Sequence, residues 1–308
     1  MLTHAADQLI GSCSDQCDAT ATRATDGGGR AYVLLDGIGS SPKVRAWTRA
    51  QARRLADLTA RSLQPNEAIT QVQREITAQP GWQDEAPGAC AVVAVTGPDQ
   101  LLRVAWVGDC RAYVLYPDGR LQRLTTDHNG RTTFEAAGWP VPRGARHIVT
   151  RCLAHPEGGE RVEPEWTAVH DRSGVRLLLA SDGCYEPIED AARDLKAELG
   201  GGAPADRAAH LVALAVRLAG ERADNATCLV VDFPAADPAA AASTSRVLCA
   251  HGYVLEQNSC PGCDAAEDAP HPADPVRVHP AWAPRPLTRC RTCGQPSRRR
   301  VHKAAEAA

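Results

Sequence analysis

Three aspartates lie beside apolar runs, where carboxylates at the ends of strands can bind a metal ion. Asp36 and Asp182 each follow such a run, and Asp224 precedes another. A glycine after Asp36 and after Asp182 lets the backbone approach closely. Oxygen ligands of this kind, without a local cluster of histidine or cysteine, favour Mg²⁺ or Mn²⁺. The pattern therefore predicts a divalent metal site, whereas any single Asp-Gly pair is by itself more typical of a turn.

The elements that must position these carboxylates are mainly strands. Apolar runs predict strands at 31–35, 89–95, 101–107, 111–116, 121–124, 175–180 and 227–233. Turn-forming residues at 97–100 and 117–120 join consecutive runs as hairpins, so the sheets should be largely antiparallel. Apolar residues recur at helical spacing in the segments around Trp47, Ile69 and Leu211, which predicts helices there. This succession predicts an α+β fold of sheets covered by helices.

Five short motifs occur in a fixed order along the chain. They are VLLDGIG at 33–39, VGDCRAY at 107–113, LTTDH at 124–128, LLASDG at 178–183 and DNAT at 224–227. On these motifs the chain resembles, over residues 11–233, the bacterial type of the metal-dependent Ser/Thr protein phosphatases of type 2C, the PPM family. The resemblance implies a four-layer αββα sandwich with two largely antiparallel sheets flanked by helices.

The resemblance also assigns roles to the three aspartates, on which catalysis would rest. Asp36 would bridge two Mn²⁺ or Mg²⁺ ions, and the carbonyl of Gly37 would bind one of them. Asp182 and Asp224 would hold the second ion. The implied reaction is the hydrolysis of phosphoserine and phosphothreonine in proteins by a hydroxide that bridges the two metals.

Further acidic residues match the family, and two neighbours depart from it. Asp109 and Glu186 would bind a weaker third ion, and Asp18 would contact the metal ligands without binding an ion itself. Cys17 stands where the family usually has glutamate, and Cys13 stands where an arginine binds the substrate phosphate. We interpret both thiols as ordinary cysteines of a reducing compartment.

Because this arginine is missing, the sequence does not determine which basic residue would bind the substrate phosphate. Arg23, Arg30 and Arg111 are the candidates to replace it. Ile38 stands where many eukaryotic relatives carry a histidine general acid, and His128 is interpreted as a structural residue at the border of the site. Two functions follow: an active phosphatase, or a catalytically weakened scaffold that binds a protein partner. The intact aspartates favour the enzyme.

The composition changes after residue 233. We predict a phosphatase-type domain at 1–233, an Ala/Pro-rich linker at 234–246, a zinc-ribbon-like module at 247–297 and a basic tail at 298–308. The module contains two C-x-x-C pairs, which predict one closed structural Zn²⁺ site formed by Cys260, Cys263, Cys290 and Cys293.

Other interpretations of the module stay open. The interval between its two cysteine pairs is longer than zinc ribbons usually have. Cys249 and His251 offer an alternative ligand pair, and unpaired thiols in a disordered tail are the remaining alternative. A module of this kind with a short basic tail favours docking to a phosphoprotein partner over binding to nucleic acid.

The overall composition limits where the protein acts. Its 308 residues carry 34 Lys plus Arg against 37 Asp plus Glu, and this balance argues against a general nucleic-acid or anionic-membrane surface. No apolar stretch approaches the roughly 18 residues of a membrane span, and the first ten residues are too polar for a signal peptide. Scattered cysteines argue against a secreted disulfide framework. We therefore expect a cytoplasmic protein whose substrate is the phosphoprotein product of a Ser/Thr kinase.

Overall fold

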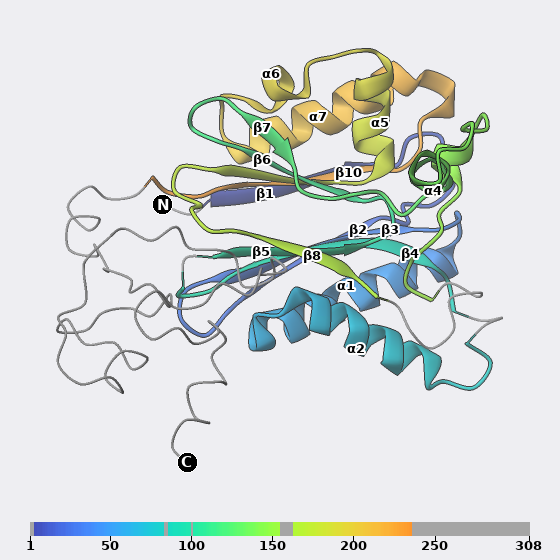
Figure 1. Cartoon of the computed structure of the whole chain (residues 1–308), viewed down its shortest axis with the longest axis horizontal. Coiled ribbons are helices and arrows are strands. Elements are labelled where there is room, and N and C mark those ends of the chain that lie inside the picture. The colour runs from blue at the N-terminus through green and yellow to red at the C-terminus, as the bar shows by residue number, and fades with distance from the viewer. Residues whose placement is uncertain (1–2, 83–85, 100, 155–162, 236–308) are drawn as a thin grey trace, which may run out of the picture. The chain divides into compact units, whose positions relative to one another are not determined.

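Two five-stranded antiparallel sheets form the centre of the domain (Figure 1). The structure, a computed structural model, describes residues 3–82, 86–99, 101–154 and 163–235. The four cysteines of the predicted zinc site, the alternative pair Cys249 and His251, and the basic tail lie outside the described residues. The boundaries predicted for the linker, module and tail therefore stay predictions.

The first sheet has the strand order β1-β10-β9-β6-β7. Its strands are β1 (Thr3–Leu9), β10 (Ala226–Asp232), β9 (Arg176–Ala180), β6 (Arg111–Leu115) and β7 (Leu121–Arg123). The second sheet has the order β2-β3-β4-β5-β8. Its strands are β2 (Ala19–Ala24), β3 (Arg30–Gly37), β4 (Ala89–Thr96), β5 (Leu102–Val107) and β8 (Glu165–Val169).

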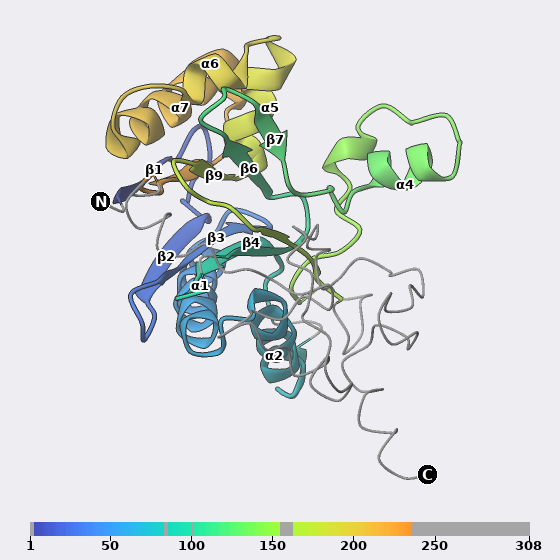
Figure 2. The same cartoon turned by 60° about the vertical axis from the view of Figure 1, so that its left-hand side comes forward.

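Helices cover the outer face of each sheet (Figure 1). The second sheet is covered by α1 (Pro42–Ser62) and α2 (Pro65–Thr77), and the first by α5 (Asp182–Asp190), α6 (Leu195–Leu199) and α7 (Pro204–Ala219). The connection from β7 to β8 carries α4 (Gly130–Ala136) and the 3₁₀ turn η1 (Ala145–His147), and α4 projects away from the sheets (Figure 2). A second 3₁₀ turn, η2 (Gly220–Arg222), precedes β10. These layers confirm the predicted α+β fold of antiparallel sheets flanked by helices.

The alternation of side chains along the strands explains the layers. On β3, Tyr32 and Leu34 enter the cluster between the two sheets, whereas Val33 and Leu35 enter the cluster under α1 and α2. All four are fully buried, because strands with both faces covered bury every side chain. Such strands read as continuous apolar runs, and this is why the sequence locates them well.

Both predicted hairpins are confirmed by the register of the strands. Val93 lies opposite Ala105 in the β4–β5 pair, and Val114 lies opposite Gln122 in the β6–β7 pair.

Several elements have no clear signal in the sequence. Within the described ranges, β1 pairs with β10 alone, and all of its side chains are exposed or half-buried, so it lacks an apolar run. β2, β8 and the short helices α5 and α6 were likewise not predicted. Among the residues that the structure describes, no helix combines the length and apolar character of a membrane span.

Candidate functional site

The three predicted aspartates lie at the ends of central strands. Asp36 is the penultimate residue of β3 and lies opposite Cys90 of β4. Asp182 is the first residue of α5, two residues after the end of β9, and Asp224 lies two residues before β10. Because β9 and β10 are antiparallel neighbours, the last residues of β9 and the first residues of β10 lie at the same end of the sheet.

Two glycines allow the elements to meet this closely. A Cβ atom at Gly183 would lie 2.2 Å from the backbone oxygen of Asn225, so α5 begins directly against the segment before β10. A Cβ atom at Gly37 would lie 2.6 Å from Thr48 of α1 and 2.7 Å from the backbone oxygen of Cys17. A larger residue at either place would displace a neighbouring aspartate, Asp36 or Asp182.

The loop before β2 is hydrogen-bonded to the segment that precedes β10, at the same end of the sheet. The backbone N–H of Cys17 donates to the side-chain oxygen of Asn225 at 2.6 Å, and the Asn225 amide donates to the carbonyl of Ile10 at 2.8 Å. Next in the loop, Asp18 is only 1% exposed and accepts a hydrogen bond from the Ser181 hydroxyl at 3.0 Å. The structure thus brings Asp18 beside the segment that carries Asp182.

The carboxyl groups raise one another's pKa, which indicates that they face a common region. Burial raises the pKa of Asp36 well above its ordinary value, and the charges of Asp182, Asp18 and Asp109 add to this effect. Burial, and then neighbouring carboxylates, raise the pKa of Asp18 to about 8 and that of Asp109 to about 7. Asp224 contributes in the same sense to Asp18 and Asp182.

This concentration of acidic groups fits divalent cations. Buried carboxylates are costly unless protons or cations neutralise them. One buried oxygen of Asp18 (Oδ1) has no hydrogen-bond partner among the described residues. Carboxylate and carbonyl oxygens are also the ligands that Mg²⁺ and Mn²⁺ prefer. The residues present therefore suit the hard divalent ions that the sequence predicts.

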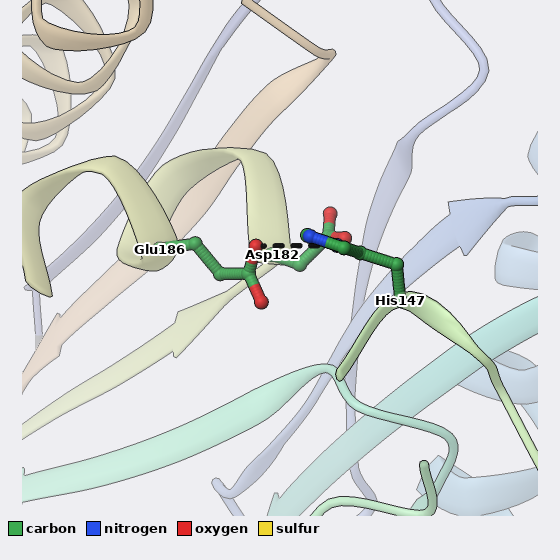
Figure 3. A group of neighbouring side chains, drawn as sticks. All are labelled: His147, Asp182 and Glu186. Atoms are coloured by element: carbon green, nitrogen blue, oxygen red, sulfur yellow. Dashed lines mark ion pairs between the residues drawn. The ribbon is translucent and has the colours of Figure 1, made fainter. Parts of the chain in front are cut away.

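A histidine that the sequence does not single out joins this group. Glu186 lies one helical turn after Asp182 on α5, and His147 of η1 points toward both (Figure 3). One ligand atom of each of the three residues lies within 4.8 Å of the others, and His147 Nδ1 is 3.6 Å from Glu186 Oε2. Burial and the charge of Asp182 raise the pKa of Glu186 to about 7, with a smaller contribution from Asp109. The third ion that the sequence predicts at Asp109 and Glu186 stays a prediction.

Two of the three candidate arginines for substrate phosphate lie at the wrong end of the sheet. Arg30 begins β3 and Asp36 lies near its other end, about 20 Å away at roughly 3.3 Å per residue. Arg23 lies beside that distant end, opposite Ala31, and forms an ion pair with Asp57 of α1 at 3.2 Å. Neither arginine can reach a phosphate held by Asp36, so this expectation is corrected.

The third candidate, Arg111, is occupied inside the domain. Its guanidinium donates to both carboxylate oxygens of Asp127, at 2.9 and 2.7 Å, and to Glu189 at 2.7 Å. It also stacks on the ring of Tyr185, 3.7 Å from the centroid. The Tyr185 hydroxyl donates to the backbone oxygen of Asp109 at 3.0 Å. Arg111 therefore supports the Asp109 turn and is not a free phosphate ligand.

Cys13 and His128 form hydrogen bonds that stabilise the segments around the site. The Cys13 thiol donates to Asp224 at 3.1 Å, and burial together with Asp224 raises the pKa of this thiol to about 11. A thiol with that pKa is protonated near neutral pH. Nδ1 of His128 accepts a hydrogen bond from the backbone N–H of Gly108 at 3.1 Å, which fixes the turn before Asp109. The structural interpretation of His128 agrees with this contact.

Comparison with known proteins gives a family match and a curated relative. Residues 43–137 match the family model of protein phosphatase 2C. This range contains Asp109 but none of Asp36, Asp182 and Asp224. The serine/threonine protein phosphatase PstP of Mycobacterium tuberculosis is 29% identical over 220 residues, which make up 67% of this chain and 40% of that relative. The chain thus matches less than half the length of this relative.

Solved structures share the fold of the domain. The catalytic domain of PstP, in complex with two manganese ions, is 26% identical, with a TM-score of 0.60 over 76% of this chain and 98% of that one. A bacterial serine phosphatase is 20% identical, with a TM-score of 0.65 over 77% of this chain and all of that one. The serine/threonine phosphatase of S. agalactiae is 20% identical, with a TM-score of 0.64 over 75% of this chain and 99% of that one.

Proposed function

We propose that the described domain is a metal-dependent protein phosphatase of the type 2C family, which removes phosphate from phosphoserine and phosphothreonine in proteins. The observation that carries the proposal is the group of mutually repelling carboxyl groups at the meeting ends of β3, β9 and β10, with the buried Asp18 beside them. The similarity to protein phosphatase 2C and to PstP supports the same assignment.

The proposed site holds two Mn²⁺ or Mg²⁺ ions. Asp36 and the carbonyl of Gly37 are the proposed ligands near α1, and Asp182 and Asp224 are the proposed ligands at the edge of the first sheet. The two manganese ions of the PstP catalytic domain support this number. When bound, such ions polarise the phosphoryl group and supply an activated water for attack in line with the leaving oxygen.

A weaker third ion is proposed at Asp109 and Glu186. Both residues have a pKa raised to about 7, because each is buried near Asp182. Neutralisation by a cation would let both carboxyl groups ionise at neutral pH.

The chain's own residues orient the ligands. Ser181 donates to Asp18 and accepts from the backbone N–H of Thr227, both at 3.0 Å, so it joins the end of β9 to the start of β10. Asp182 accepts a hydrogen bond from the N–H of Gly183 at 2.6 Å, which fixes its carboxylate at the start of α5. These contacts would hold the ligands in place before substrate arrives, and such preorganisation is the main protein contribution to phosphoryl transfer.

The alternative function, a weakened scaffold that binds a partner, is not favoured. Cys13 and Cys17 are the features that support it, but the metal-binding aspartates are intact. A scaffold without turnover has no reason to keep buried carboxylates that repel one another.

Metal-dependent release of phosphate tests the proposed function. The purified chain should release phosphate from a phosphothreonine peptide only with added Mn²⁺ or Mg²⁺, and should resist okadaic-acid-type inhibitors. Asp36→Asn and Asp182→Asn should each lower kcat by at least about a hundredfold, because a lost metal ligand removes several kcal/mol of transition-state stabilisation.

A second Asp-Gly pair provides the control. Asp118 lies in the exposed turn between β6 and β7, where it accepts a hydrogen bond from the N–H of Arg120 at 2.8 Å. Asp118→Asn should leave turnover within about twofold, as for surface substitutions. Unchanged phosphate release in both Asp36→Asn and Asp182→Asn would refute the assignment.

We also propose that the C-terminal module binds one structural Zn²⁺ through its two cysteine pairs and docks a phosphoprotein partner. The support is the pairing and spacing of the thiols in the sequence. Zinc content should fall from one equivalent per chain to none in the double variant Cys260→Ser/Cys263→Ser, and should persist in Cys249→Ser. Zinc that persists in the double variant would assign the ligands elsewhere. The cytoplasmic location and the partner kinase stay predictions from the sequence.

A further inference from the structure

We infer that Arg146 of η1 binds the phosphate of the substrate, in place of the arginine that the loop at 11–18 lacks. This inference rests on the proposed function and names a residue for substrate recognition at the same site. A phosphate dianion that approaches so many carboxylates needs a positive group in addition to the metal ions. Cysteine at position 13 offers no positive charge, and Arg23, Arg30 and Arg111 are excluded by the positions and contacts described above.

Arg146 lies on the side of the site that α5 forms. Its Nε is 3.6 Å from Glu186 Oε2, the same oxygen that lies 3.6 Å from His147 Nδ1. Asp182, Glu186 and Asp190 follow one another at intervals of four residues on α5, so they lie along one face of the helix. The guanidinium therefore lies along the face that begins with the proposed metal ligand Asp182.

The present partner of Arg146 is one that a phosphate can replace. Two guanidinium nitrogens donate to the two carboxylate oxygens of Asp190, at 2.6 Å each. A guanidinium binds phosphate with the same two-pronged geometry, so an exchange of partner keeps both hydrogen bonds. The Asp190 side chain is 52% exposed, so water can solvate its carboxylate when the guanidinium turns to a phosphate.

Arg45 is the competing cation, and its partner carboxylate is the more buried of the two. It lies on α1, one residue after Val44, which contacts Gly37, and it forms an ion pair with Asp15 at 3.0 Å. The Asp15 side chain is only 11% exposed, so release of Arg45 would leave a largely buried carboxylate without its partner. Arg146 can exchange its partner at lower cost and is therefore the better candidate.

Kinetics and phosphate binding of the Mn²⁺-loaded full chain test the inference. Arg146→Gln should raise KM for a phosphothreonine peptide and Kd for inorganic phosphate by about tenfold or more, the effect of losing a charge-assisted pair of hydrogen bonds. The affinity for the two ions proposed at Asp36, Asp182 and Asp224 should stay within about twofold, because Arg146 contacts none of these residues among the ion pairs of the described chain. Arg146→Lys keeps the charge without the planar fork and should give an intermediate loss.

A second variant separates recognition of phosphate from a merely structural role. If Arg146 only fastens η1 to α5, Asp190→Asn removes the same ion pair and should reproduce the defect of Arg146→Gln. If Arg146 binds phosphate, Asp190→Asn frees the guanidinium and should leave KM and Kd unchanged or lower. Arg131, which pairs with Glu135 on α4 at 2.8 Å, is the matched control, and Arg131→Gln should change neither constant.

The outcomes distinguish this inference from the proposed function. A chain that binds inorganic phosphate through Arg146 but never releases phosphate from the peptide would refute the function and support the inference. Turnover with unchanged KM and Kd in Arg146→Gln would overturn the inference and leave the function intact. Loss in Arg45→Gln instead, or equal losses in Arg146→Gln and Asp190→Asn, would also overturn it.

Discussion

At the scale of single residues, the site is a set of acids that the fold keeps partly protonated when no cation is bound. Asp18 is the clearest case, because burial raises its pKa from 3.8 to about 8 while Ser181 satisfies one of its oxygens. The folded chain therefore binds this proton more tightly than the unfolded chain does. Metal ions and protons compete for the same oxygens, so the stability of the domain should depend on both.

The sign of this dependence gives a prediction for the metal-free protein. A group whose pKa is raised by folding contributes its stability fully below the unfolded pKa, about 4 for Asp18, and loses it as the pH rises to the folded pKa, about 8. In EDTA, the Tm should therefore fall between pH 5 and pH 8. Each kcal/mol lost corresponds to about 2–4 °C in a domain of this size. Mn²⁺ should restore the Tm at pH 8, as measured by differential scanning calorimetry.

Two aspartate variants check the origin of this effect. Asp18→Asn carries no titrating proton and should show a shallower fall of Tm with pH in EDTA. Asp118→Asn, in the exposed hairpin turn, should keep the slope of the unchanged chain. A Tm that rises with pH in EDTA, or identical slopes in Asp18→Asn and the unchanged chain, would contradict the assignment of these pKa shifts.

At the scale of elements, the site depends on how three chain segments are joined. The loop at 10–18, the start of α5 and the start of β10 converge on Asn225. Its side chain joins the loop to β10 through two hydrogen bonds, and its backbone oxygen lies against Gly183. Asn225 is thus a positioning residue for Asp18, Asp182 and Asp224, which lie on these segments.

Removal of this side chain should loosen the loop more than the domain. Asn225→Ala leaves the buried N–H of Cys17 without its partner, which costs about 1–3 kcal/mol, and removes the hydrogen bond to the more exposed carbonyl of Ile10. We expect a free energy of unfolding lower by about 2 kcal/mol and faster amide hydrogen exchange at residues 11–18. Asn66→Ala on α2 should change neither quantity. Unchanged exchange in Asn225→Ala would show that the loop is held by other contacts.

At the scale of the whole molecule, the two sheets belong to one compact unit whose packing extends to about residue 235. Phe233 follows β10, is 4% exposed and belongs to the cluster between the sheets. Asp232 accepts two hydrogen bonds from Arg176 of β9, at 2.6 and 2.7 Å. The backbone N–H of Gly174 donates to the carbonyl of Pro234 at 3.0 Å. The packing thus continues slightly past the last strand.

Truncation tests this boundary. A chain that ends at Ala235 should keep its cooperative thermal transition and the proposed Mn²⁺-dependent turnover. A chain that ends at Val231 loses the Arg176 partner and the Phe233 ring, and its free energy of unfolding should fall by about 3–5 kcal/mol, as for the loss of a large buried aromatic side chain. Equal stability of the two truncated chains would place the boundary of the domain earlier.

The sequence by itself determined the strands that carry apolar runs, the hairpins and the acidic residue types of the site. Buried strands such as β3 and β4 are continuous apolar runs, and turn residues mark their ends, so both signals lie within a few neighbouring positions. The aspartates that follow these runs were identified for the same reason. Edge strand β1 lacks this signal because none of its side chains is fully buried.

Only the tertiary structure decided which basic residues accompany the acids. Arg23, Arg30 and Arg111 were reasonable candidates by sequence, but register, distance and ion pairs remove each of them. Arg146 and His147 reach α5 through a connection that carries no recognisable motif. The physical reason is that a charge acts through space over a few ångströms, whereas sequence patterns record only what is near along the chain.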